Sequence, residues 1–552
     1  MLRIQPVNPA DGLSASPDLH VLKYGGVQGI NIMMNANKTG LRFVFLTVYF
    51  GLCFSSISRG QTTNRYWPDD KWRVASPEEQ GIDSEMLLKA FRNIQPSQDD
   101  FHSLLIIRNG YVITEAYWAP YHRRTTHNVK SATKSIMSAL TGIALRKKYL
   151  NNLQQTVKEF FPEYVDEPQK KDISLRNLLT MTAGIDWREA AGPSPFDLEN
   201  WKKLPMKDAP GKRFEYNTML PQMMSAIITK SSGMSTKDFA DKFLFQPLGI
   251  NNYQWAKTDN GYYHGGSDVF LTPLDMAKFG YLYLNNGLWK GRQIISEKWA
   301  KESTTKKISA PSDLRWAAGL DYGFWWWVPA KSYMAWGFGG QYIIVRPDLN
   351  LVIVVTGNGR DGANNYKSFM ETFLENYIFR AIRGNGPLPP NPKACQNLNG
   401  LLQKLENPEA VLIPPMPTTA AKISGRNYIL EPNKLHFKSF VLSFKNNNEC
   451  SWQLPMGKEM VNCQVGLDGI YRINRLGFSM GVNPDGDQVA CKGSWISDDT
   501  FLIEFHIIGD PSKQKIQLRF AEDKARMNIS NLGMDTVING AAKNSELKGL
   551  LH

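Results

Sequence analysis

The sequence predicts an α/β (α+β) domain, built on a mixed sheet with a helical insertion, that is followed by an all-β module. Three observations lead to this fold class. A helix and a hairpin come first, helical segments fill the middle, and strands return at residues 342–356. A stretch rich in Pro and Gly at residues 384–393 predicts a linker. From residue 422 onward short alternating strands predict an antiparallel sandwich or small barrel.

The first elements follow from local patterns. Residues 83–94 place apolar side chains on one face with helical spacing, so they are expected to form a helix. The apolar runs 104–108 and 111–118 flank the dipeptide Asn109-Gly110. That dipeptide between two apolar runs predicts a β-hairpin with a type I′ turn.

The middle of the chain is expected to be mainly helical. One predicted helix begins at Ser131, and another covers residues 221–230 and ends near Gly233. Two strands, 342–345 and 351–356, then return the chain to the sheet. A short helix over residues 395–405 follows the linker.

The N-terminal region predicts a secretory signal peptide. Lys38 and Arg42 precede the apolar run 43–54, and small residues follow it. The run is short for a membrane span, so we expect no integral span in the mature chain and an exported protein, periplasmic or extracellular. Met33 stands where such a peptide would start.

The domain organisation follows from these boundaries. It comprises 1–32 as a mis-assigned start or leader, 33–60 as the signal peptide, 61–383 as the first domain, 384–393 as the linker, and 394–552 as a C-terminal region with a short helix and an all-β module.

Charge and cysteine content argue against nucleic-acid binding and against a cysteine nucleophile. The net charge of +13 is spread without a long Lys/Arg block, so no nucleic-acid partner is expected. Without Cys53, the remaining cysteines are Cys395, Cys450, Cys463 and Cys491. In an exported protein these four either form two disulfides, in one of three pairings, or stay free. No cysteine nucleophile is available in the first domain.

A Ser-x-x-Lys motif supplies the candidate nucleophile. The pattern occurs four times, beginning at Ser131, Ser303, Ser512 and Ser545. Only Ser131 leads a long apolar helical run, because residues 136–144 have the spacing of a buried helix. Ser131 and Lys134 then lie one turn apart on one face, where the amine can accept the hydroxyl proton.

Two further segments can complete such a site. Tyr216 lies between a Pro-Gly pair and an apolar helix, and a phenol near ammonium groups has a lowered pKa and acts as a general base. The alternative is a packed tyrosine with a satisfied hydroxyl. Residues 335–341 are rich in Gly and precede a strand, which allows close approach of a substrate. The alternative there is an ordinary turn.

The motifs together resemble those of a known superfamily. Five segments occur in its order, namely Ser131-Ala132-Thr133-Lys134 and residues 178–185, 211–216, 245–249 and 271–277. Residues 70–380 therefore resemble the serine β-lactamase and penicillin-binding-protein superfamily, in the branch of class C β-lactamases, carboxylesterases and 6-aminohexanoate-dimer hydrolases. The resemblance implies a β-lactamase/transpeptidase-like fold for this region.

The resemblance also implies roles for individual residues. Ser131 is the acylated nucleophile, Lys134 its proton acceptor, and Tyr216 the group that protonates the leaving group and helps to activate water. The backbone of Ser131 and, less directly, of Phe338 would supply the oxyanion donors. Acylation and hydrolysis need no cofactor and no metal, and none is expected.

Two departures from the superfamily pattern concern the substrate. The Tyr-x-Asn motif reads Tyr216-Asn217-Thr218, so its amide is missing or displaced. The Lys-Thr-Gly motif, whose cation binds a substrate carboxylate, reads Ala335-Trp336-Gly337. Loss of that cation favours a neutral or apolar acyl group. Candidate substrate-binding residues are Asn217, Trp187, His264, Trp327, Trp336 and Gly337. The alternative is core packing for the tryptophans and a solvated loop position for His264.

The sequence thus predicts an exported serine hydrolase that cleaves a small-molecule ester, amide or peptide substrate through a Ser131 acyl-enzyme. The alternatives within the superfamily are a β-lactamase or a D-Ala-D-Ala carboxypeptidase. A penicillin-binding-like sensor that is acylated without turnover is an alternative of a different kind. The C-terminal module carries no recognised catalytic motif.

Overall fold

The computed structural model describes residues 66–68, 71–94, 101–165, 170–188, 193–314, 316–358, 369–444, 448–456, 458–480, 482, 486–531 and 534–542. The chain divides into the units Met1–Asn64 and Arg65–His552, and all described residues belong to the second. The expected leader, 1–32, and signal peptide, 33–60, lie outside the described residues. No helix in the described part of the chain is both long and apolar enough to cross a membrane.

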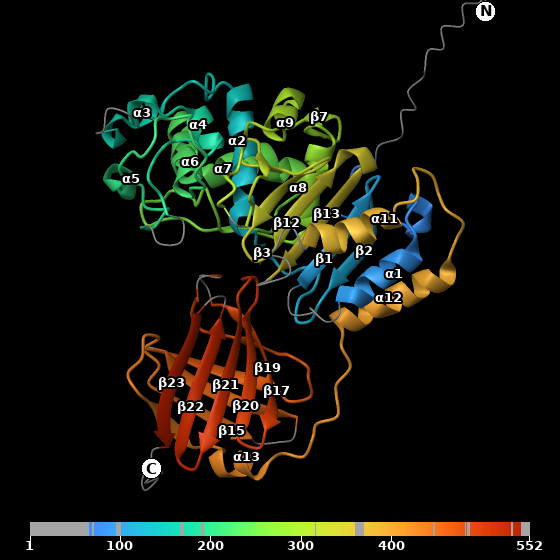
Figure 1. Cartoon of the computed structure of the whole chain (residues 1–552), viewed down its shortest axis with the longest axis vertical. Helices are drawn as coiled ribbons and strands as arrows, with labels where there is room; N and C mark the ends of the chain where they lie inside the picture. Colours follow the sequence, from blue (N-terminus) through green and yellow to red (C-terminus); the bar gives the residue numbers. More distant parts are fainter. Residues whose placement is uncertain are drawn as a thin grey trace, which may run out of the picture. The chain divides into compact units, whose positions relative to one another are not determined.

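The first domain is built on an eight-stranded sheet (Figure 1). Its strand order is β2 (Tyr111–Tyr117), β1 (Phe101–Arg108), β13 (Leu351–Gly357), β12 (Gln341–Arg346), β11 (Tyr333–Gly337), β10 (Trp327–Val328), β9 (Asp321–Tyr322) and β8 (Ile308–Ser309). The paired strands run antiparallel, and an isolated bridge between Val74 and Val112 adds a parallel pairing beside them. The sheet therefore has fewer parallel pairings than the mixed sheet that was expected. Tight turns join several of its neighbouring strands, and such turns produce antiparallel pairs.

The predicted turns are present. Asn109 and Gly110 have φ angles of 53° and 84°, the left-handed values that a type I′ hairpin turn requires. The turn between β12 and β13 ends at Asn350, which has a φ of 48°. Every residue of β1, β12 and β13 is buried, which explains why these strands read as continuous apolar runs.

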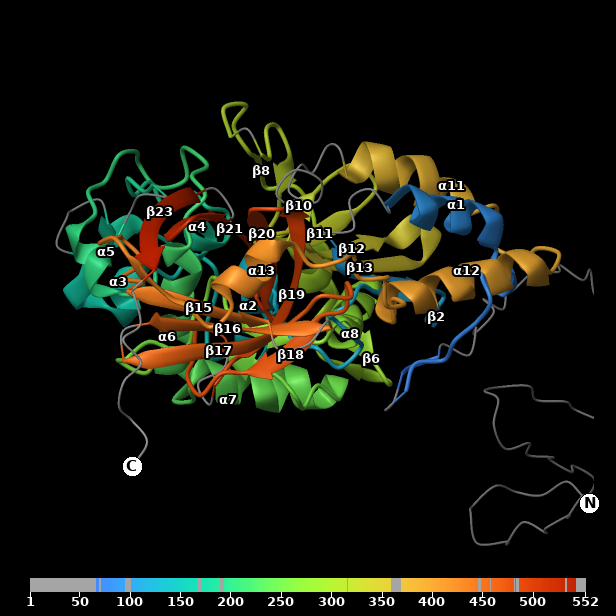
Figure 2. The ribbon, with the colours of Figure 1, turned by 90° about the horizontal axis from the view of Figure 1, so that it is seen from below.

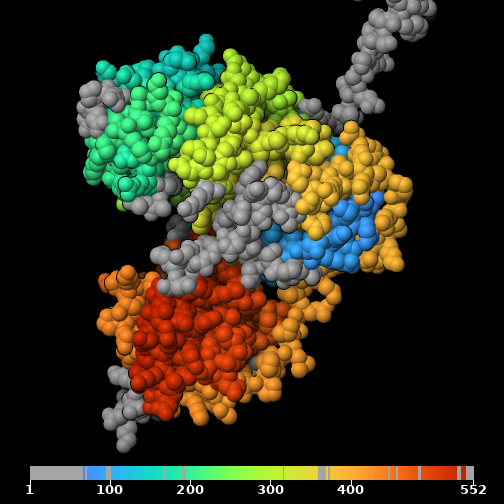
Figure 3. All heavy atoms as spheres, in the orientation of Figure 1, coloured from blue at the N-terminus to red at the C-terminus, as the bar shows by residue number. Residues whose placement is uncertain are grey.

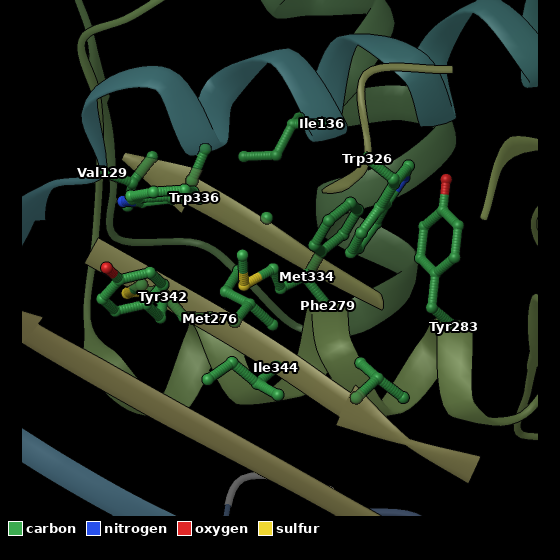
Figure 4. Packing of buried hydrophobic residues seen from close by; sticks show 14 of the residues in the cluster. Val129, Ile136, Met276, Phe279, Tyr283, Trp326, Met334, Trp336, Tyr342 and Ile344 are labelled. Carbon is green, nitrogen blue, oxygen red and sulfur yellow. The ribbon is translucent and has the colours of Figure 1, made fainter. Parts of the chain in front are cut away.

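Helices pack on the sheet and on one another (Figure 1). The terminal helices α1 (Ser84–Ile94), η9 (Phe369–Ile378), α11 (Phe379–Ala381) and α12 (Pro392–Glu406) form one group, and α12 also contacts β2. Helix α8 (Pro273–Leu284) packs on β1, β12 and β13, and α2 (Thr133–Arg146) packs near β11. In Figure 4, Ile136 of α2, Met276 and Phe279 of α8, and Met334 of β11 fill the core beside the sheet.

The predicted helical insertion lies between the β1–β2 hairpin and β11, and its side chains form a continuous lobe (green in Figure 3). Its helix α6 (Met219–Ser232) ends at the left-handed Gly233 as predicted. The other elements are α3 (Val157–Phe160), α4 (Leu175–Leu179), α5 (Glu199–Lys203), α7 (Thr236–Ala240), α9 (Glu297–Ser303) and the small-sheet strands β3 (His127–Asn128), β4 (Gln254–Trp255), β5 (Val269–Leu271), β6 (Leu288–Trp289) and β7 (Arg292–Gln293).

The C-terminal module is a β-barrel (Figure 2). Its strands are β14 (Asn427–Leu430), β15 (Ser439–Phe444), β16 (Glu449–Met456), β17 (Glu459–Gly466), β18 (Arg472–Arg475), β19 (Gln488–Ser497), β20 (Thr500–Ile507), β21 (Lys513–Ala521), β22 (Lys524–Asn531) and β23 (Met534–Ala542). They form a ten-stranded sheet that closes through a pairing of β17 with β19. Alternate side chains fill a separate core, and helix α13 (Thr418–Ile423) contributes to it.

The boundary between the two cores differs from the expected linker at 384–393. Leu398 and Leu405 of α12 belong to the core of the first domain, and the Ala119 amide donates to the Leu405 carbonyl at 2.9 Å. The second core begins at Ile423. The connection therefore follows α12, because the apolar face of this helix packs on α1 and β2.

The sequence left two alternatives for the four cysteines, two disulfides or free thiols, and the structure has the second. All four described cysteines are free thiols. Cys395 donates to the Glu78 carboxylate in the first domain, at 3.1 Å, whereas the other three are buried inside the barrel. The fold thus separates Cys395 from the residues with which it would have to pair.

Candidate active site

Ser131 lies in a short 3₁₀ turn, η3 (Lys130–Ala132), immediately before α2. The α-helix itself begins at Thr133, two residues later than expected. Lys134 follows one turn after Ser131, and its Nζ lies 2.8 Å from Ser131 Oγ. The Ser-x-x-Lys motif therefore forms the predicted contact.

Three oxygen atoms surround the amine of Lys134. Besides Ser131 Oγ, Nζ lies 3.0 Å from Thr218 Oγ1 and 3.0 Å from the carbonyl oxygen of Gly266. The Lys134 side chain is 1% exposed. An amine in this position can accept one proton from Ser131 and donate its own two N–H bonds to Thr218 and Gly266.

Tyr216 comes close to the same amine. Its ring centroid lies 4.8 Å from Lys134 Nζ. The ring is held between Trp327, which stacks at 6.0 Å, and Trp316, which meets it edge-on at 5.2 Å. The segment before α6 thus brings Tyr216 to the Ser131–Lys134 pair, as the sequence motif predicted.

The end of strand β11 approaches the nucleophile from another side. A Cβ atom on Gly337 would lie 2.1 Å from the Val129 carbonyl oxygen, so only glycine allows this close approach. Phe338 follows in the turn after β11, and its side chain is 53% exposed. The Ser131 amide lies in the first turn of its helix and has no intrahelical acceptor. These two backbone regions are the predicted oxyanion donors.

A cleft of about 760 Å³ opens at Ser131. Its apolar wall includes Trp187, Phe214, Leu314, Trp316, Trp336 and Phe338. Three charged residues also line it, namely Arg213, Glu215 and Asp313. The cleft is therefore mainly aromatic, and its charged groups include one cation and two carboxylates.

The structure places three of the six predicted substrate-binding residues in this cleft, namely Trp187, Trp336 and Gly337. Trp336 lies beside Val129 at the start of the nucleophile segment (Figure 4). Trp327 is buried behind the wall and packs against Trp316 and Trp336, at ring separations of 5.3 and 5.7 Å. It shapes the cleft through these neighbours.

Besides Trp327, two more predicted substrate-binding residues lie outside the cleft lining. Asn217 is buried, and its carboxamide oxygen accepts a hydrogen bond from the Met219 amide at 2.8 Å, at the start of α6. His264 stacks on Phe196 at 3.8 Å, and its Nδ1 lies 2.8 Å from Asp268. Both side chains stabilise local structure next to the residues that contact Lys134.

Asp268 is the charged centre of this neighbouring network. Its carboxylate accepts a hydrogen bond from the side-chain Nδ2 of Asn128 at 2.7 Å and also contacts His264. Burial acts to raise the pKa of Asp268, but the hydrogen bonds from His264 and Asn128 and the nearby charge of Lys130 lower it to about 2. Asp268 is therefore ionised at neutral pH. It links Asn128, which precedes the nucleophile, to His264, which precedes Gly266.

Several residues of the site were not identified from the sequence. Thr218 and the Gly266 carbonyl contact Lys134, but a single threonine and a backbone oxygen give no sequence pattern. Trp316 lines the cleft and is 41% exposed. The sequence signal that could have identified Trp316 was a tryptophan in a polar loop. Among the described residues, no three His, Cys, Asp or Glu side chains are grouped so that they could hold a metal ion.

Part of the first domain matches a known family. Residues 101–368 match the family described as Beta-lactamase. These residues include Ser131, Lys134, Tyr216 and strands β1 to β13. The first domain thus contains a β-lactamase family region and has the fold of the serine β-lactamase and penicillin-binding-protein superfamily.

Individual relatives are distant. An uncharacterised protein of Alkalihalophilus pseudofirmus is 22% identical over 315 residues, which cover 49% of this chain and 88% of that protein. The 6-aminohexanoate-dimer hydrolase of Paenarthrobacter ureafaciens is 21% identical over 282 residues, which cover 46% and 71%. The solved structure of a putative 6-aminohexanoate-dimer hydrolase from Bacillus anthracis is 18% identical, covers 56% of this chain and 87% of its own, and has a TM-score of 0.46.

Proposed function

We propose that this protein is a serine hydrolase that cleaves an ester or amide through an acyl-enzyme on Ser131. The observation that carries the proposal is the 2.8 Å contact between Ser131 Oγ and Lys134 Nζ at a cleft of about 760 Å³. A hydroxyl is a weak nucleophile until a neighbouring base accepts its proton. In the proposed mechanism Lys134 accepts this proton, and the cleft gives a substrate carbonyl access to Ser131.

The proposed proton route uses two side chains. When Ser131 Oγ attacks the carbonyl carbon, its proton passes to Lys134, and Tyr216 protonates the leaving alcohol or amine. In the second half-reaction water attacks the acyl-enzyme, its proton returns through the same groups, and Ser131 is released. The proximity of Tyr216 to Lys134 Nζ, 4.8 Å from ring centroid to nitrogen, supports the coupling of the two.

Backbone amides are proposed to stabilise the oxyanion. The Ser131 amide has no helical acceptor, and Phe338 follows β11 where that strand lies against Val129. Two such donors, aimed at the developing charge of a tetrahedral intermediate, are typical of acyl-transfer sites. The tight contact at Gly337 fixes the separation of the two segments.

The cleft favours a neutral, apolar acyl group. Trp336 lines it where the superfamily motif has a hydroxyl residue, and no lysine stands in that motif. Arg213 is accompanied by Glu215 and Asp313, so the charged groups of the lining do not favour a free substrate carboxylate. The aromatic wall suits an apolar chain. An ester or a non-peptidic amide fits these surroundings better than a penicillin.

The test is a comparison of p-nitrophenyl butyrate with nitrocefin, using the wild type and Ser131→Ala. We expect ester turnover that is lost in Ser131→Ala, with little nitrocefin turnover. Nitrocefin hydrolysis that depends on Ser131 would favour a β-lactamase instead. Stoichiometric labelling by a fluorescent penicillin without release would favour a penicillin-binding sensor. Absence of both labelling and turnover would reject an acyl-enzyme on Ser131.

Export is a separate proposal that rests on residues 33–60. The charged start, the short apolar run and the small residues after it support a cleaved signal peptide. N-terminal sequencing of the protein recovered outside the cytoplasm tests it. We expect a new terminus near residue 60, and an uncleaved chain retained in the cytoplasm would contradict export.

A further inference from the structure

A loop of the C-terminal barrel contacts the segment that carries the nucleophile. This 508–512 loop joins β20 to β21. Its Gly509 carbonyl accepts a hydrogen bond from the Asn128 amide at 2.7 Å. The carboxylate of its Asp510 lies 2.9 Å from Lys130 Nζ. Asn128 and Lys130 are the residues that lead directly into Ser131.

Close backbone approach fixes the same loop at two more points. A Cβ atom on Gly509, whose φ is 93°, would lie 2.8 Å from the Thr126 carbonyl oxygen. A Cβ atom on Gly339 would lie 2.6 Å from Pro511. Gly339 follows Phe338, so the loop contacts both segments that are proposed to supply oxyanion donors.

Further hydrogen bonds orient the ion pair between Lys130 and Asp510. Asp510 Oδ1 accepts hydrogen bonds from the Ser512 amide and hydroxyl, at 2.9 and 2.5 Å, which leaves Oδ2 directed at Lys130. The side chains of Lys130 and Asp510 are 23% and 19% exposed, so solvent screens this pair less than a surface pair.

Lys130 needs such support because its backbone is strained. Its φ of 48° is a left-handed conformation that a lysine rarely adopts. Its amide donates to Asn128 Oδ1 at 2.9 Å, and Asn128 in turn donates to Asp268 at 2.7 Å. The conformation at Lys130 determines where the next residue, Ser131, points its amide and hydroxyl.

We propose that the 508–512 loop is a positioning element of the active site, in which Asp510 holds Lys130 and thereby orients Ser131. The inference rests on the proposed function, because it assigns to the barrel a part in the chemistry of Ser131. Asp510 touches no reacting atom and acts through Lys130. The barrel thus supports turnover in addition to any other role it has.

The test combines kinetics with hydrogen exchange on the full chain. Asp510→Asn keeps the shape of the side chain and removes its charge. We expect kcat for p-nitrophenyl butyrate to fall on the order of tenfold or more, with KM changed less than about twofold, because misplacement of a nucleophile slows the chemical step. Amide exchange over residues 127–134 should rise in the same variant.

A charge swap and a matched control complete the design. Lys130→Asp combined with Asp510→Lys restores the pair, and aspartate tolerates the left-handed φ at position 130. We expect this double variant to recover most of the lost kcat and exchange protection. Asp523→Asn removes an ion pair to Arg426 of similar length, 2.8 Å, elsewhere in the barrel and should change neither quantity.

The outcomes separate two failures. Unchanged kcat and unchanged exchange in Asp510→Asn would overturn the positioning role, as would equal losses in Asp523→Asn. If the wild type shows no turnover that depends on Ser131, the proposed function fails. The exchange measurement then still decides whether Asp510 holds the 127–134 segment.

Discussion

At the scale of single residues, Lys134 depends on oxygen atoms that differ in kind. One belongs to the proposed nucleophile, one to the backbone of Gly266, and one to Thr218. Only the last can be removed by a side-chain substitution that leaves Ser131 in place. Thr218 is therefore the most direct probe of how the amine is positioned.

We expect Thr218→Val to lower kcat for p-nitrophenyl butyrate by roughly 10- to 100-fold with little change in KM. A hydrogen bond to a charged or strongly polar group contributes roughly 1.5–3 kcal/mol, and about 1.4 kcal/mol corresponds to a factor of ten in rate. Thr229→Val is the matched control, because it removes a 3.0 Å bond to the Ser225 carbonyl on the same helix. Equal effects of both variants would indicate general damage to α6.

Trp316 is expected to determine which acyl groups the cleft accepts. Its ring meets those of Tyr216 and Trp336, each at 5.2 Å, and remains 41% exposed. Trp316→Ala should lower kcat/KM for p-nitrophenyl octanoate by about tenfold, through lost apolar contact, and change p-nitrophenyl acetate by less than about twofold. A similar loss with both esters would mean that Trp316 supports Tyr216 instead of binding the acyl chain.

The sequence predicts part of this site, and the reason is local geometry. Ser131 and Lys134 are separated by one turn, so their contact follows from spacing alone. The contacts of Lys134 with Thr218 and Gly266 span more than eighty residues and depend on how α6 and the chain after it pack. For Asn217 the motif position suggested a substrate contact that the structure does not show. Its side chain instead accepts a hydrogen bond at the start of α6.

At the scale of elements, helix α12 connects the two modules and packs with the first. Its buried face includes Leu398 and Leu405, and the Leu405 carbonyl accepts from the Ala119 amide. An amphipathic pattern identifies a helix but not the surface it covers. The pattern at 395–405 therefore predicted the helix correctly, but it could not show that this helix packs with the first domain.

Two truncations test the place of α12. A chain that ends at residue 407 keeps α12, and one that ends at residue 391 loses it. We expect the longer chain to unfold at the higher Tm by thermal circular dichroism, because burial of two leucine side chains contributes roughly 3–6 kcal/mol. Both chains lack the 508–512 loop, so both should have low turnover. Equal Tm values would contradict the packing of α12 on the first domain.

Closure of the barrel is the other element-scale feature that local patterns leave open. Alternating strands are compatible with either a sandwich or a barrel. The barrel results from the pairing of Gly466 in β17 with Lys492 in β19, a contact between strands that are not consecutive. Within the closed barrel, hairpins such as the 508–512 loop lie at the ends of strands, where they are available for contacts with the first domain.

At the scale of the whole molecule, two buried histidines are expected to make stability depend on pH. His102 stacks on Tyr121 at 3.7 Å, and neither ring nitrogen of His102 or His127 has a hydrogen-bond partner among the described residues. Burial lowers the pKa of His127 to about 3, with a further contribution from His122. Burial, together with His127, His506 and Lys513, holds the pKa of His102 well below its usual value.

The sign of the effect follows from proton uptake. Between pH 6.5 and about 3 the unfolded chain protonates His127 and the folded chain does not, so the stabilisation is complete above pH 6.5 and is lost as the pH falls. His127 contributes a slope of about 1.4 kcal/mol per pH unit in that window. We expect the free energy of unfolding, from urea titrations, to be about 2 kcal/mol lower at pH 5 than at pH 7 from His127, and His102 to lower it further in the same direction. His127→Phe should remove the His127 contribution of about 2 kcal/mol, whereas His436→Gln, at an exposed position, should remove none. A pH dependence that persists in the double variant His102→Phe and His127→Phe would assign the acid sensitivity to other groups.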